Sequence, residues 1–454
     1  MKPSINRLNL YAAGALAALL LSACSGSNKQ TIAPANASVR VVHAAPDAPA
    51  VDVEFNGSSA INNLDYGKAS DAIAAKPGAL NVVVRGRLPG TARPTVIGPA
   101  DITLAAGGVY AVMAVNTVAS IEPLVITRET SAVSSANVRL QVVHAAPAAP
   151  AVAVYVTAPG ADLASSTPVG SVSFKESLAA ATVPAGDYQI RVTPAGANAP
   201  VIFDSGTVAL AGGSDLLVAA LQNTGPGSSP ISLLAVPASG STLRLLDKTT
   251  PARVRVIHGS ADAPTVQVIA NDNFAAPLVD SLTFPNATPF LDVPAATYNL
   301  KVTPVGNNGV IAINADATLA AGNTYSIYAV GPLAAIEPLI LTDDPRRVAT
   351  QARVRIVHGS PSAGNVDLYV QAPGTALTNA TAAFTNVAFK GDTGYVDLDA
   401  GTYEVSVTPT GSKAAAIGPL TVALANSGIY TVVARDAAGG GVPLSIIGLD
   451  DLAP

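Results

Sequence analysis

One short phrase built around a histidine occurs four times in this chain, and this repetition constrains the fold more than any other feature. The phrases read VRVVHAAPDAPAVDV, LQVVHAAPAAPAVAV, VRVIHGSADAPTVQV and VRIVHGSPSAGNVDL, and they carry His43, His144, His258 and His358. Successive histidines are separated by 101, 114 and 100 residues. A motif that returns at the length of a small domain indicates tandem copies of that domain. The chain is therefore predicted to contain four homologous domains.

A second landmark follows each phrase: a turn of small residues that leads into a strand, in most copies with a tyrosine near its start. It reads AGDYQIRVTP at 185–194, AATYNLKVTP at 295–304 and AGTYEVSVTP at 400–409, with PGALNVVVRG at 77–86 as a degenerate copy. We expect Tyr188, Tyr298 and Tyr403 to pack against this turn, as the tyrosine corner of β-sandwiches does.

The four repeats also alternate in type. The first and third share a closing strand, IEPLVIT at 121–127 and IEPLILT at 336–342, while the second and fourth share an insertion, YVTAPG at 155–160 and YVQAPG at 369–374. The first and third histidines are 215 residues apart, and the second and fourth are 214 apart. This agreement indicates that a two-domain unit was duplicated, which gives the order A1-B1-A2-B2.

Within each repeat, short runs rich in Val, Ile, Thr and Tyr alternate with Pro, Gly, Asn and Asp at spacings typical of an antiparallel sandwich. The predicted fold class is all-β: four tandem immunoglobulin-like antiparallel β-sandwiches. Their predicted ranges are 38–129 (A1), 137–236 (B1), 252–342 (A2) and 352–450 (B2). Linkers are expected near 130–136, 237–251 and 343–351.

The N-terminal residues resemble a bacterial lipoprotein signal. A basic start and an apolar stretch precede Leu21-Ser22-Ala23-Cys24, which matches the lipobox. Residues 1–23 are therefore predicted to be a cleaved signal peptide, and Cys24 is predicted to carry the lipid, including palmitate. Residues 24–37 are predicted to be the lipidated cysteine and a flexible tether. Ser25 after the cysteine resembles a sorting signal for the outer membrane, with the periplasmic face and the cell surface both left open.

Composition excludes several classes of protein. The chain has 25 Lys+Arg against 30 Asp+Glu and one Cys, so neither nucleic-acid binding nor a disulfide framework is expected. No metal site and no cofactor are expected, because the histidines lie in separate domains and motifs of cofactor enzymes are missing. The acidic pairs Asp343-Asp344 and Asp450-Asp451 leave one alternative open, a Ca²⁺ site at a domain junction.

The recurrent histidine is predicted to have a structural role. Counting by two along the strand places Val39 and Val41 on the same side as His43, near the strand end, where its ring can bond carbonyls of the next turn. The alternative is a ligand-binding, basic or pH-sensing residue beside Asp47 and Asp52. The cognates of Asp47 are Ala148, Asp262 and Ser362, and those of Asp52 are Ala153, Gln267 and Asp367. Because the second repeat has a carboxylate at neither position, the structural role is favoured for all four histidines.

The opposite face of this strand is polar and often basic. Positions five and three before each histidine hold Ser38 and Arg40, Arg139 and Gln141, Arg253 and Arg255, and Arg353 and Arg355. We predict that this face points outward, with its charge protecting an edge strand from pairing with another sheet. The alternative is that Arg253, Arg255, Arg353 and Arg355 form an anion-binding strip for an acidic envelope polymer.

The phrase V-R-V-V-H-A-A-P-D-A-P-x-V-D-V, with the later A-G-x-Y strand, resembles the bacterial domain-of-unknown-function family 4397, and the likeness extends from Val39 to the C-terminus. The resemblance implies a secreted or lipid-anchored envelope protein and no particular activity. The predicted function is a non-enzymatic, lipid-anchored array of domains for spacing, adhesion or partner binding. Its partners are the membrane, through the lipid, and an envelope protein or polymer. The alternative is an accessory or enzymatic protein that acts on a cell-surface polymer through loops of the B-type domains.

Overall fold

The computed structural model describes residues 34–452, and nearly all of their regular structure is β-strand. The predicted signal peptide, Cys24 and most of the tether lie outside these residues. Within them we find no helix that is long and apolar enough to cross a membrane. The helices that do occur are four short 3-10 turns.

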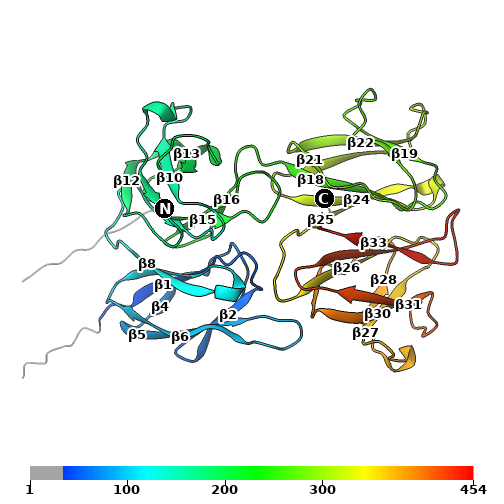
Figure 1. Ribbon diagram of the computed structural model, residues 1–454, viewed down its shortest axis with the longest axis horizontal. Helices are drawn as coiled ribbons and strands as arrows, with labels where there is room; N and C mark the ends of the chain where they lie inside the picture. Colours follow the sequence, from blue (N-terminus) through cyan, green and yellow to red (C-terminus); the bar gives the residue numbers. More distant parts are fainter. Residues whose placement is uncertain (1–33, 453–454) are drawn as a thin grey trace, which may run out of the picture. The chain divides into compact units, whose positions relative to one another are not determined.

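The first sandwich, A1, consists of two four-stranded sheets, coloured blue to cyan in Figure 1. One sheet has the order β4-β1-β7-β8 and the other β3-β2-β5-β6. The elements are β1 (Ala37–His43), β2 (Val51–Phe55), β3 (Ser58–Leu64), β4 (Ile73–Ala75), β5 (Gly78–Gly86), β6 (Thr95–Leu104), β7 (Val109–Val115), η1 (Val118–Ser120) and β8 (Glu122–Arg128).

The second sandwich, B1, pairs a five-stranded sheet, β12-β9-β15-β16-β17, with a four-stranded sheet, β11-β10-β13-β14. The fifth strand, β17, falls in the segment predicted to be a linker. The elements are β9 (Asn137–His144), β10 (Val152–Thr157), η2 (Leu163–Ser165), β11 (Gly170–Val172), β12 (Ala181–Pro184), β13 (Gly186–Pro194), β14 (Phe203–Leu210), β15 (Asp215–Gln222), β16 (Ile231–Pro237) and β17 (Leu243–Leu245).

The third sandwich, A2, repeats the arrangement of A1, with sheets β21-β18-β24-β25 and β20-β19-β22-β23. Its 3-10 turn lies before the closing strand, as in A1. The elements are β18 (Ala252–His258), β19 (Val266–Ala270), β20 (Val279–Leu282), β21 (Leu291–Val293), β22 (Ala296–Pro304), β23 (Ile313–Leu319), β24 (Thr324–Val330), η3 (Leu333–Ala335) and β25 (Glu337–Asp343).

The fourth sandwich, B2, has sheets β29-β26-β32-β33 and β28-β27-β30-β31, drawn in orange to red in Figure 1. Its 3-10 turn lies in the early insertion, as in B1, so the placement of these turns follows the A-B-A-B order. The elements are β26 (Ala352–His358), β27 (Val366–Gln371), η4 (Leu377–Asn379), β28 (Phe384–Val387), β29 (Val396–Leu398), β30 (Gly401–Pro409), β31 (Ile417–Leu424), β32 (Ile429–Arg435) and β33 (Ser445–Asp450).

The histidine strand of every sandwich lies inside its sheet and has one parallel neighbour. β1 pairs antiparallel with β4 and parallel with β7, with His43 opposite Ala114. The same parallel pair recurs as β9 with β15, β18 with β24, and β26 with β32. The prediction of an all-β sandwich is confirmed, but one strand pair in each copy runs parallel, and the histidine strand is not an edge strand.

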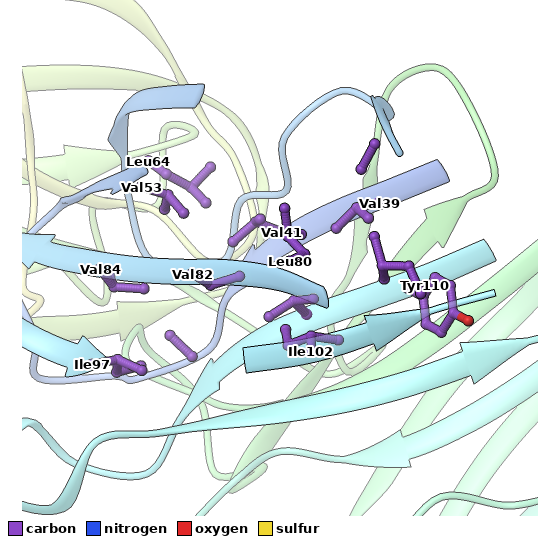
Figure 2. Close-up of a cluster of buried hydrophobic side chains, with 14 of the residues drawn as sticks. Val39, Val41, Val53, Leu64, Leu80, Val82, Val84, Ile97, Ile102 and Tyr110 are labelled. Carbon is purple, nitrogen blue, oxygen red and sulfur yellow. The ribbon is translucent and has the colours of Figure 1, made fainter. Parts of the chain in front are cut away.

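Successive side chains of β1 point to opposite faces of the sheet and pack into two different apolar cores. Val39 and Val41 are at most 3% exposed and pack between the two sheets of A1 with side chains of the facing sheet, such as Val53 and Val82. Figure 2 shows these side chains gathered between the strands. Complete burial of one such valine stabilises a fold by about 1.5–3 kcal/mol.

The other face of β1 is buried as well, because a neighbouring sandwich covers it. Val42 is fully buried in a cluster that joins A1 to B1, and Val143, its cognate on β9, lies in the same cluster. Ile257 and Val357, the cognates in A2 and B2, share a second cluster. The predicted outward face is therefore wrong: sandwiches pack against each other, sheet to sheet, through the face that carries the arginines.

Candidate functional site

Each motif histidine is enclosed and bonded to the turn that follows its strand. The side chains of His43, His144 and His258 are 0% exposed, and that of His358 is 1% exposed. In His43, Nε2 lies 2.9 Å from the carbonyl oxygen of Pro49, and Nδ1 accepts the backbone N–H of Ala45 at 3.3 Å. Since a carbonyl only accepts and an N–H only donates, this geometry requires the neutral ring with its proton on Nε2.

Burial disfavours the charged form of these rings. It lowers the pKa of His43 to about 4, although the carbonyl of Pro49 opposes the shift. Burial likewise lowers the pKa of His258 and His358 below the ordinary value. His43, His258 and His358 are therefore neutral near pH 7.

An aromatic ring contacts each histidine edge-on, which the sequence analysis missed. The ring centroids of His43 and Tyr66 are 6.2 Å apart, and the other pairs fall between 6.1 and 6.4 Å. The partners of His144, His258 and His358 are Phe174, Phe284 and Phe389. An aromatic residue between the histidine phrase and the tyrosine turn of every repeat was the signal that identifies this partner.

The carboxylates considered as catalytic partners of the histidines accept hydrogen bonds from backbone N–H groups instead. Asp47 accepts the N–H of Val118 at 2.8 Å, and Asp262 accepts that of Leu333 at 2.8 Å, so both hold the loop of the A-type 3-10 turn. Asp52 and Asp367 accept N–H groups of Asn63 and Asn386, both of which have a φ of 57°. No histidine–carboxylate pair of an acid–base site is formed by these residues.

The tyrosines of the second landmark behave as predicted. The hydroxyl of Tyr188 donates to the carbonyl of Pro184, that of Tyr298 to Pro294, and that of Tyr403 to Asp399. Each bond reaches back across the turn before the strand. These residues therefore fasten a turn, in the manner of a tyrosine corner.

Arg255 and Arg355 lie in a buried polar cluster between A2 and B2, so the alternative of an anion-binding strip is wrong for them. Their side chains are 3% and 2% exposed, and each donates to a buried carboxylate of the other sandwich. Arg355 Nη2 lies 2.5 Å from Asp343 Oδ1, and Arg255 Nη2 lies 2.5 Å from Asp451 Oδ1. Because the arginines already form ion pairs with these carboxylates, the alternative of a Ca²⁺ site is wrong for Asp343 and Asp451.

Hydroxyl groups complete this cluster with approximate two-fold symmetry. Ser326 accepts from Arg255 and donates to Asp343, while Thr431 accepts from Arg355 and donates to Asp451. Arg255 lies over the ring of Phe290 and Arg355 over that of Tyr395, each with 4.7 Å from the Arg Cζ to the centroid. Arg353 also lies over the ring of Tyr395, at 5.1 Å. Burial raises the pKa of Asp343, and the charge of Arg355 opposes that shift.

Arg253 and Arg353, the other members of the alternative anion-binding strip, are already paired with carboxylates. Arg253 makes a two-pronged contact with Asp292, its cross-strand partner, at 2.7 and 3.1 Å. Arg353 lies 2.8 Å from Asp344 and 3.5 Å from Asp397. The four arginines therefore present no continuous cationic strip.

The A1–B1 interface fills the equivalent positions with different polar groups. Arg128 and Arg139 both donate to Asp215, at 2.5 and 2.7 Å. Arg40 donates to the carbonyl of Pro237 at 2.5 Å, and the hydroxyl of Tyr66 donates to that of Gln222 at 2.6 Å. In this interface the single carboxylate of Asp215 forms ion pairs with two guanidinium groups, those of Arg128 and Arg139.

Two crevices adjoin the segment that connects A2 to B2. The A1–B1 crevice, about 570 Å³, and the A2–B2 crevice, about 610 Å³, share Thr224, Pro345 and Arg347 in their walls. Both volumes are within the range of small-ligand sites. No group of three or more His, Cys, Asp or Glu side chains within residues 34–452 is arranged to hold a metal ion.

Comparison with known proteins gives a family and no activity. The family described as "Domain of unknown function (DUF4397)" matches residues 37–155, 252–369 and 372–453. The first two segments begin at β1 and β18 and end within β10 and β27, so the two halves match in the same register. No curated protein matches the chain.

Similarity to solved structures is slight. The Bacillus anthracis TIE protein is 10% identical with a TM-score of 0.16, over 86% of this chain and 69% of that one. A leucine-rich repeat protein from Bacteroides thetaiotaomicron is 15% identical with a TM-score of 0.12, over 41% of this chain and 25% of that one. Neither similarity carries an argument about fold or function. The repeated histidine phrase and the three matched segments show that the chain belongs to the DUF4397 family.

Proposed function

We propose that this chain is a non-catalytic, lipid-anchored protein of the outer membrane whose sandwiches form a binding scaffold. The observation that carries the proposal is the use of the recurrent polar residues. The histidines bond turns, Asp47 and Asp52 accept backbone N–H groups, and Arg255 and Arg355 join sandwiches. The histidine, which recurs in every repeat, and these polar residues therefore support a folded architecture rather than a reaction.

The contacts between sandwiches favour a scaffold over a flexible spacer. Apolar clusters join A1 to B1 and A2 to B2. The connecting segment also reaches A1, where Arg346 donates to the carbonyl of Ala48 at 2.8 Å and to Asp65 at 2.5 Å. Large apolar interfaces restrict the relative motion of domains.

The location is tested by removing the lipid acceptor. Cys24→Ser should release the protein from the membrane fraction and abolish acyl labelling, because the lipidated sulfur is the proposed attachment. The matched control combines Cys24→Ser with Ser27→Cys, which restores a thiol outside the lipobox and should remain released. Membrane retention and acyl labelling of the Cys24→Ser protein would refute the proposed anchorage.

A further inference from the structure

The two crevices beside the A2–B2 connection have one positively charged side chain in common, that of Arg347. Arg347 is exposed and lies in the walls of both. No ion pair involving Arg347 occurs among residues 34–452, whereas its neighbour Arg346 is bound to Asp65. An arginine that faces two crevices without an ion-pair partner favours an anionic ligand, since its guanidinium can bind carboxylate oxygens in pairs.

The other charged groups in the wall of the A2–B2 crevice are already paired with an opposite charge. In the A2–B2 crevice, Arg253 pairs with Asp292, and Asp451 pairs with Arg255. In the A1–B1 crevice, the Asp47 carboxylate accepts the N–H of Val118 but has no cationic partner among residues 34–452, so the acidic group of a ligand is expected on the A2–B2 side of Arg347. A bound ligand would therefore have its charge complemented by Arg347 and need not displace an existing pair.

The two crevices differ in their uncharged lining. Phe290, Leu291 and Leu452 give the A2–B2 crevice an apolar wall. Asn116, Thr117 and Gln222 give the A1–B1 crevice amide and hydroxyl groups that can bond a main chain. A ligand that spans both would combine an apolar group, an acidic group and a run of hydrogen-bonding groups, which is the chemistry of a peptide.

A polysaccharide fits this lining less well. Sugar rings bind proteins by stacking on aromatic faces, and Phe290 is the aromatic residue of these two walls. The guanidinium of Arg255 lies over its ring, 4.7 Å from the centroid. One face of the ring is thereby occupied, so the crevices offer little aromatic surface to a sugar.

We propose that the crevices meeting at Arg347 bind an acidic peptide segment of a partner protein. This inference rests on the proposed binding role and specifies where the partner binds. Attachment to the membrane is tested in cells by the Cys24 variants, whereas peptide binding is tested with isolated protein, so the two can fail separately.

The test uses the immobilised full chain and a degenerate pool of ten-residue peptides. Half of the pool has glutamate fixed at the centre, and the other half has glutamine there. We expect at least tenfold enrichment of the glutamate peptides, declining as salt is raised. Arg347→Gln should reduce the enrichment about tenfold, while Lys76→Gln, which removes an exposed positive charge outside both crevices, should not change it.

Several outcomes would overturn the proposal. Equal retention of the two pools would show that no acidic group is recognised. Enrichment that survives Arg347→Gln would place the peptide elsewhere. If an oligouronate or vesicles of anionic phospholipid bind in an Arg347-dependent manner and the peptides do not, the ligand belongs to another class and the peptide assignment is wrong.

Discussion

Arg355 of B2 and Asp343 of A2 form a buried ion pair across the sandwich interface, with 2.5 Å between Nη2 and Oδ1. Both side chains are 2% exposed. A buried pair of this kind contributes little net stability compared with apolar residues, but the loss of one partner leaves a charge without compensation.

Arg355→Met should therefore destabilise A2–B2 by about 3–5 kcal/mol, measured by urea unfolding. The double variant Arg355→Met with Asp343→Leu should recover most of that loss, because no charge remains buried alone. Arg353→Met, at a more exposed ion pair, should cost about 1 kcal/mol or less. A double variant that is no more stable than Arg355→Met would contradict this account.

The buried neutral His43 should make folding sensitive to acid. Its pKa is lowered from 6.5 to about 4, so the unfolded chain binds the proton more readily than the folded one. The contribution of His43 to stability should be fully present above pH 6.5, decrease between pH 6.5 and about 4, and stay constant below that. The loss should be on the order of 3 kcal/mol in total.

Because carboxylates also titrate in this range, the measurement compares the wild type with His43→Gln. Chemical unfolding at pH 7 and pH 4.5 gives the difference in stability between the two proteins. That difference should shrink at the lower pH. A difference that does not change with pH would mean that the folded ring accepts a proton as readily as the unfolded one.

The carboxylate of Asp47 should hold the loop around η1. Asp47→Ala removes the acceptor of the Val118 N–H and should cost about 1–2 kcal/mol. Hydrogen exchange at Val118 should accelerate, and Asp47→Asn should retain most of the protection because its side-chain oxygen still accepts. Unchanged exchange at Val118 in the alanine variant would show that the loop is fixed by other contacts.

Arg346 should fasten the connection between A2 and B2 onto A1. Arg346→Ala removes bonds to Ala48 and Asp65 and a contact with the ring of Tyr66. Cleavage within residues 343–351 by proteinase K should become faster. The neighbouring Arg347→Ala is the matched control and should be cleaved like the wild type. Equal cleavage of both variants would show that the connection is held by other contacts.

Much of the architecture could be predicted because alternation and repetition are local properties of the sequence. The fourfold phrase, the tyrosine turns and the shared insertions indicate a sandwich repeated in two types. Strand direction was less accessible: β1 and β7 pair parallel, although they are far apart in sequence. Their pairing depends on how the two sheets close, which periodicity does not specify.

The error at the arginine face has a physical cause. Counting by two correctly placed Arg40 and Val42 on the face opposite Val41, but it gave no information about what covers that face. Val42, Val143, Ile257 and Val357 are apolar at the same position in all four repeats, which is unusual for a solvated surface. Apolar residues alternating with arginines were a signal of a buried interface that also contains ion pairs.

The closing strands of A1 and A2 end in residues of opposite charge, which affects which A-type sandwich can pack against which B-type sandwich. IEPLVIT is followed by Arg128, whereas the cognate strand IEPLILT is followed by Asp343. If A1 met B2 during folding, Arg128 would take the place of Asp343 and face Arg355. If A2 met B1, Asp343 would face Asp215 in the same way. Both mismatched assemblies would place like charges opposite each other, so this single exchange disfavours misassembly between the homologous copies of a tandem repeat.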